Sequence, residues 1–219
     1  MTTRPRSELA IPAHGLVQRT RDALFELISR IPASSEDLVV DAATRARHLT
    51  TTAALKAATI SGSLALPPGP LGLVTVLPDL YAVWRVQAQL VSDIAAVHGK
   101  TAFLTQEAMA WCLFRHAAAQ AVRDVVTRVG ERVVVNRISL RAMETVLTKV
   151  GVTTTRRVLE KGAARFIPVV GALGVAAYAY YDTGRVGHAA IDLFDKEIST
   201  DDVGVPIGRE GGNKGEHRS

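Results

Sequence analysis

The candidate reactive residues of this sequence are one cysteine, six histidines and two aspartates. Each of the two aspartates follows an uncharged stretch. Cys112 and His116 are four positions apart, so a helix would place them one turn apart on the same face. Such a pair could form a nucleophile and its general base. Cys112 also lies beside Trp111 on a predicted apolar face, where an inert buried thiol is the commoner role, and we expect that role here.

Metal and phosphate sites have recognisable spacings, and none of them occurs in the sequence. No two histidines are three or four positions apart, the spacing that would place two ligands on one helix face. Walker A, glycine-rich dinucleotide-binding, His-Glu-x-x-His and Cys-x-x-Cys patterns are absent as well. We therefore assign no catalytic residue, cofactor or metal ligand, and we expect a protein that is not an enzyme. The histidines are His14, His48, His98, His116, His188 and His217.

Asp79 and Asp182 are each the first acidic residue after a long stretch without charge. At a helix N-terminus a carboxylate satisfies free backbone amides and the helix dipole, which contributes about 0.3–1 kcal/mol. That structural role is the more common one for such residues. The alternative is a polar cluster that holds the two uncharged segments in place or controls their exposure. Its members would be Asp79, Arg85, Asp182, Arg185 and His188.

The two uncharged stretches decide the environment that the protein needs. The first lies between Lys56 and Asp79 and is broken by Pro67-Pro68-Gly69-Pro70, so its helical part, 57–66, would cover only about 15 Å of a ~30 Å hydrocarbon core. The second, 166–181, has 16 residues and is interrupted by Pro168, Gly171 and Gly174. Neither stretch suits a membrane span, and neither is polar enough to remain in water.

Two dry environments remain open for these segments: one leaflet of a membrane, or the core of the protein itself. Glycines and alanines in the second segment form a surface for close helix contact, which would serve core packing or a homo-oligomer. Six residues are the predicted contacts with a membrane or a partner. They are Leu71, Leu73, Val74, Val76, Gly171 and Gly174.

Composition favours helices. Hydrophobic residues make up 47% of the 219 residues but aromatic residues only 5%, so alanine and valine dominate the apolar fraction. We predict an all-α fold, a multi-helix bundle with two apolar helical hairpins broken by proline or glycine. Residues 1–33 would form an N-terminal arm with an amphipathic helix, 34–198 a helical domain, and 199–219 a disordered polar tail.

Helix boundaries follow from capping residues and glycines. Ser34 and Ser35 suggest a helix start, Gly99 and Gly151 suggest helix ends, and Thr105 suggests a cap. The predicted helices cover about 14–31, 35–66, 79–98, 105–129, 136–150, 153–165 and 182–196.

Charge and cysteine content bear on location. The net charge is +5, but acidic residues interleave with the basic ones and few aromatics accompany them, so we predict no nucleic-acid partner. A positive balance suits an anionic inner leaflet. One cysteine excludes an internal disulfide, and the N-terminus lacks the apolar run of a signal peptide. We expect a cytoplasmic protein that is peripheral to, or partly inserted in, the inner membrane.

Two long segments resemble a known family. LPPGPLGLVTVLPDLYAVWRVQAQLVSDIAAVHGK (66–100) and FIPVVGALGVAAYAYYDTGRVGHAAIDLF (166–194) are similar to the two signatures of the EcsC family and of related GTPase-associated helical domains. Together they cover about a third of the chain. His98 stands where tyrosine is commoner in the family, and no GTPase motif accompanies the domain.

The resemblance implies a bacterial helical protein that associates with membranes. Our leading expectation is therefore a non-enzymatic, membrane-associated helical protein, with an accessory role in a transport or envelope system as one form of that function. The partner would be a membrane surface or a membrane protein. The alternative is a soluble cytoplasmic scaffold that homo-oligomerises through its glycine- and alanine-rich helices.

Overall fold

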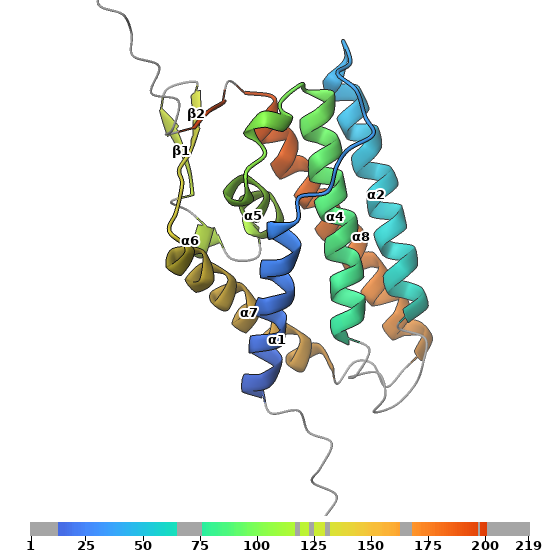
Figure 1. Ribbon diagram of the computed structural model, residues 1–219. Coiled ribbons are helices and arrows are strands. Elements are labelled where there is room, and N and C mark those ends of the chain that lie inside the picture. Colours follow the sequence, from blue (N-terminus) through green and yellow to red (C-terminus); the bar gives the residue numbers. More distant parts are fainter. Residues whose placement is uncertain are drawn as a thin grey trace, which may run out of the picture.

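The computed structural model confirms an all-α multi-helix bundle, to which one small sheet is added (Figure 1). It describes residues 13–64, 76–116, 119–122, 125–129, 132–162, 168–196 and 198–200. The helices are α1 (Ala13–Ser29), α2 (Ala42–Leu64), α4 (Val76–Val97), the 3-10 turn η1 (Thr101–Phe103), α5 (Gln106–Phe114), α6 (Ala119–Val122), α7 (Leu140–Gly162) and α8 (Pro168–Phe194). The strands are β1 (Val126–Val129), β2 (Arg132–Val135) and β3 (Ile198–Thr200).

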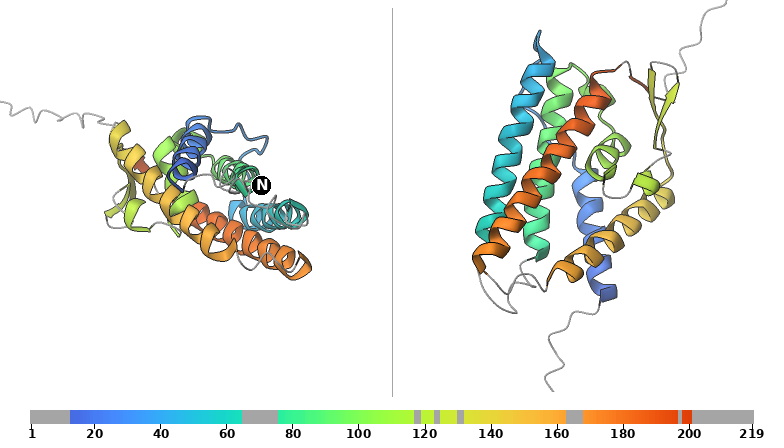
Figure 2. Two further views of the ribbon diagram at one scale, coloured as in Figure 1. Left: turned by 90° about the horizontal axis from the view of Figure 1, so that it is seen from below. Right: turned by 180° about the vertical axis from the view of Figure 1, so that it is seen from behind.

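Helices α2, α4 and α8 pack against one another as a group of three, with α2 running opposite to the other two (Figures 1 and 2). Glycines allow α2 and α8 to approach closely at both ends of their contact. A Cβ atom on Gly62 would be 3.3 Å from the Ala176 Cβ, and one on Gly187 would overlap the side chain of Thr50. The two helices are therefore held together by small side chains, where bulkier ones would not fit.

The second group of elements consists of α1, α5 and α7, on the side of the molecule away from α2 (Figure 2, left). Gly151 was predicted to end a helix, and that prediction is wrong, because α7 continues through it. The glycine is needed for packing: a Cβ at Gly151 would lie 3.3 Å from the Val17 carbonyl oxygen of α1. The two predicted helices at 136–150 and 153–165 are accordingly one helix.

Two predicted helix boundaries are confirmed by their backbone geometry. Gly99 has a φ of +66°, which suits glycine, and the amides of Gly99 and Lys100 donate to Ala96 and Ala95, so α4 ends in a Schellman motif. The Thr105 hydroxyl accepts a hydrogen bond from the Ala108 amide and caps α5.

The predicted start of the second helix at Ser35 is wrong. Residues 31–39 have neither helix nor strand structure, and the Ser34 hydroxyl lies 2.6 Å from the Asp93 carboxylate of α4, so this serine ties the segment to the bundle. The cap is Asp41, whose carboxylate accepts a hydrogen bond from the Thr44 amide. Serine and aspartate both suit a cap, so the residue types alone do not separate the two positions.

The predicted helix at 105–129 is wrong in its C-terminal part. Helix α5 ends at Phe114, α6 is short, and β1 pairs antiparallel with β2, which pairs in parallel with β3. Valines at 125, 126, 129 and 133–135 explain the difference, because β-branched side chains favour strands and pack well on a pleated surface. Val133 and Val135 of β2 are buried in the main core.

The second uncharged stretch is not broken in the described part of the chain. Helix α8 runs without interruption through Gly171 and Gly174 to Phe194, so it joins the predicted apolar segment to the predicted helix at 182–196. A glycine costs a helix only about 1 kcal/mol, which a long, well-packed helix tolerates. Residues 65–75, with Leu71, Leu73 and Val74, lie outside the described residues, and Val76 is the first residue of α4.

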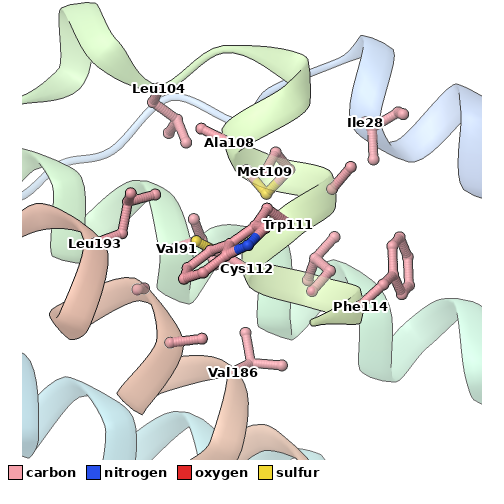
Figure 3. Close-up of a cluster of buried hydrophobic side chains, with 14 of the residues drawn as sticks. Ile28, Val91, Leu104, Ala108, Met109, Trp111, Cys112, Phe114, Val186 and Leu193 are labelled. Carbon is pink, nitrogen blue, oxygen red and sulfur yellow. The ribbon is translucent and has the colours of Figure 1, made fainter. Parts of the chain in front are cut away.

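The core joins both groups of helices. Leu24, Leu27 and Ile28 of α1 belong to the same buried cluster as apolar side chains of α4, α5 and α8. Helix α1 therefore packs as part of the bundle. Figure 3 shows this cluster around Trp111 and Cys112 of α5. The C-terminal end of α8 is held by Lys100, whose ammonium donates to the carbonyl oxygens of Phe194 and Lys196 at 2.6 and 2.5 Å.

Candidate functional site

A buried polar cluster connects α4, the end of α5 and α8. We call it the Asp182 cluster; it consists of Gln87, His116, Asp182 and Thr183. The Asp182 carboxylate lies 2.8 Å from the Nε2 atom of His116 and accepts a hydrogen bond of 3.0 Å from the Gln87 amide. The same Gln87 amide donates to the Thr183 hydroxyl at 3.2 Å. The cluster thus links three elements of the bundle through polar contacts.

The Asp182 carboxyl is ionised in this environment. Burial would raise its pKa, but the hydrogen bond and charge of His116, the Gln87 amide and the charge of Arg185 together lower the pKa below its usual value. An ionised carboxylate only accepts hydrogen bonds, so His116 must carry a hydrogen on Nε2. The resulting pair has the arrangement of a histidine oriented by a carboxylate.

A histidine oriented in this way could act as a base only if a nucleophile faced its other nitrogen. The Nδ1 atom of His116 is buried and has no hydrogen-bond partner among the described residues. Cys112, the one nearby thiol in the chain, is fully buried, and burial raises the pKa of its thiol far above the ordinary value. Figure 3 shows Cys112 among the apolar side chains of Val91 and Trp111. The arrangement supports a structural pair.

Cys112 should therefore resist modification in the folded protein. A neutral, buried thiol is a poor nucleophile because the thiolate is the reactive form. We expect a thiol reagent such as DTNB to label less than about a hundredth as fast in buffer as in denaturant, where the residue is exposed. The release of thionitrobenzoate measures both rates, and rapid labelling of the folded protein at neutral pH would contradict the buried assignment.

The structure places the predicted polar residues on two helices, Asp79 and Arg85 on α4 and the other three on α8. Arg185 is exposed and lies with its guanidinium 5.8 Å from the centre of the Tyr181 ring, close enough to Asp182 to lower its pKa. His188 is exposed, and its Nδ1 atom is 2.6 Å from the Gly184 carbonyl oxygen of its own helix. Arg85 is exposed on α4. Asp79 lies in the first turn of α4, and its side chain is outside the described residues.

Two members of the Asp182 cluster, Gln87 and His116, were not predicted as partners of Asp182. Gln87 had a signal in the sequence, because it stands within the apolar stripe of its helix, three residues after Trp84 and four before Val91. A polar residue in such a stripe needs a buried partner. Periodicity reveals that need but not the partner, which lies 95 positions later.

The second candidate site is one end of the group formed by α2, α4 and α8, and we call it the uncharged end. It is formed by residues 57–64 of α2 and 168–181 of α8, none of which is charged. The close approach of Gly62 to Ala176, and a small cluster of Ala57, Val83 and Ala179, show that the two uncharged stretches lie together. Residues 76–84 of α4 complete this end, and Asp79 is their one charged residue.

The outer face of α8 at the uncharged end is not covered by any other element of the described part of the chain at Leu173 and Gly174. Leu173 is 66% exposed, and a Cβ at Gly174 would meet no atom within 4 Å. Three exposed tyrosines follow, Tyr178, Tyr180 and Tyr181. This exposed face of α8 therefore presents one leucine, an open glycine position and three tyrosines to its surroundings.

Comparison of the chain with protein-family models, with curated proteins and with solved structures found no match. The resemblance to the EcsC family stays a prediction. Among the described residues, no helix combines the length and the apolar character that a membrane span requires. The described residues also contain no group of three histidine, cysteine or acidic side chains that could hold a metal ion.

Proposed function

We propose that this is a non-enzymatic, membrane-associated helical protein that places its uncharged end in one leaflet of a membrane. The observation that carries the proposal is that two uncharged stretches, more than 100 residues apart in the sequence, pack against each other at one end of the bundle. A core in the middle of the molecule does not need an uncharged surface at one end, whereas a membrane contact does.

The dimensions of the uncharged end support a single leaflet. Residues 168–181 of α8 extend over about 20 Å at 1.5 Å per residue. Half of a bilayer, with its headgroups, measures about 20–22 Å. The tyrosines of α8 lie toward the inner limit of this end, where a headgroup region would meet them, as is common for interfacial aromatic side chains.

Vesicle flotation with two matched variants tests this function. Leu173→Asp changes an exposed leucine of the uncharged end, and Leu140→Asp changes a leucine of α7 with nearly the same exposure, 66% against 69%. An aspartate in place of a leucine costs about 3 kcal/mol at the centre of a membrane and less near its surface. We therefore expect Leu173→Asp to weaken vesicle binding at least about tenfold, while Leu140→Asp binds like the wild type.

The competing function is a scaffold that self-associates through the same face of α8. The open space above Gly174 favours it, since a second helix could approach there. Light scattering on the same variants separates the two functions. A wild-type protein that never floats with vesicles, and that changes from an oligomer to a monomer in Leu173→Asp, would support the scaffold and contradict the membrane proposal.

A further inference from the structure

Two basic side chains mark the level at which the bundle changes from charged to uncharged. Lys56 directly precedes the uncharged residues of α2, and Arg85 follows Val83 of α4 by two positions. Val83 packs with Ala57 of α2 and Ala179 of α8, so Lys56 and Arg85 lie within about one helical turn of a common layer. Both side chains are exposed, and neither forms an ion pair with a described residue.

The Asp182 carboxylate of α8 forms no ion pair with Lys56 or Arg85. Asp182 is already engaged by the His116 ring and the Gln87 amide. By contrast, several arginines far from the uncharged end pair with acidic residues, for example Arg30 with Glu26 and Arg45 with Glu36. Among the described side chains, Lys56 and Arg85 thus have no acidic partner, which leaves their positive charges available to an external anion.

Along α2 and α8, chemical groups follow one another in the order found in a leaflet. The basic layer comes first, the tyrosines of α8 lie at and just beyond it, and Leu173 lies closer to the tip. Phosphates, the interfacial region and the hydrocarbon occur in the same order in a phospholipid monolayer, and tyrosine is enriched at the interface.

We infer that the uncharged end recognises anionic phospholipids, with Lys56 and Arg85 contacting their headgroup phosphates. This inference rests on the proposed membrane function and adds to it a selection among lipids. Each basic residue near an anionic surface raises binding about fivefold, and the attraction falls off within about 8–10 Å at physiological salt. Binding through Lys56 and Arg85 therefore requires the uncharged end itself to meet the lipid.

Flotation with two kinds of vesicle tests the inference, using vesicles of phosphatidylcholine alone and of phosphatidylcholine mixed with phosphatidylglycerol. We expect the double variant Lys56→Gln/Arg85→Gln to lose about 25-fold in binding to the anionic vesicles, and to bind the phosphatidylcholine vesicles like the wild type. The control is Arg141→Gln/Lys149→Gln, which removes one arginine and one lysine from exposed positions of α7 and should retain the wild-type preference.

Each other outcome has a definite meaning. Equal binding of the wild type to both kinds of vesicle, or an equal loss in the two double variants, would overturn the lipid selection and leave membrane association intact. A wild-type protein that floats with neither kind of vesicle would overturn the selection and the proposed function together. Circular dichroism of both variants confirms that the comparison is made between folded proteins.

Discussion

Gly187→Ala is expected to lower the free energy of unfolding by about 2–3 kcal/mol, although the substitution adds a single methyl group. The new Cβ would overlap Oγ1 and Cγ2 of Thr50 and would lie 2.9 Å from the Thr50 Cβ. Thr50 is buried on α2, its short side chain has little freedom to turn away, and its hydroxyl donates to the Ala46 carbonyl oxygen. The two helices must therefore separate, which loosens the packing of α2 against α8.

The control for this prediction is Gly184→Ala, one turn earlier in α8, where a Cβ would meet nothing within 4 Å. It should stabilise the protein by up to about 1 kcal/mol, because alanine is the better helix former. Urea unfolding followed by circular dichroism measures both changes. Combining Gly187→Ala with Thr50→Ala should recover part of the loss; equal stabilities for the two glycine variants would show that α2 and α8 do not approach as closely as described.

Asp182→Ala should cost about 3 kcal/mol of stability at neutral pH. The substitution removes the charged carboxylate that accepts hydrogen bonds from Gln87 and His116. It also leaves the Nε2 atom of His116 buried without a partner. Asp192→Ala is the comparison in the same helix: its partners Arg115 and Lys196 are partly exposed, so it should cost no more than about 1 kcal/mol. Urea unfolding of both variants measures the difference, and equal losses would contradict the structural role of the Asp182 cluster.

The contribution of Asp182 to the free energy of unfolding also depends on pH, and it should decrease on acidification. Because the pKa of Asp182 is lower in the folded protein than in the unfolded chain, the ionised carboxylate stabilises the fold above the unfolded value. The stabilisation is lost as the pH falls through the folded value. The stability difference between wild type and Asp182→Ala should therefore shrink below about pH 4. A difference that grows on acidification would contradict the lowered pKa.

Local signals in the sequence predicted much of the helical architecture. The apolar periodicity of α1 and α4, the glycine after α4 and the cap at Thr105 each depend on neighbouring residues, and all are found in the structure. The errors arose where one residue type serves two purposes. Gly151 could end a helix or admit a neighbouring one, and the valines near 125–135 could line a helix or form strands.

The candidate sites were predicted less completely, because they depend on contacts between distant residues. The sequence marked Asp182 by its position after an uncharged stretch, but the partners His116 and Gln87 are known only from the packing of α4, α5 and α8. Likewise, each of the two uncharged stretches can be recognised in the sequence. That they pack against each other at one end follows only from the antiparallel packing of α2 and α8 in the structure.

That pairing also affects how the protein is made. The partner of Gln87 is synthesised 95 residues later, and α2 precedes α8 by an even longer interval. At roughly 5–20 residues per second, a ribosome leaves α2 and α4 without α8 for at least about 5 s. During that time their apolar faces are open to chaperones or to other nascent chains. A premature stop codon before α8 would make this exposure permanent, and we expect such truncated products to be degraded or to aggregate.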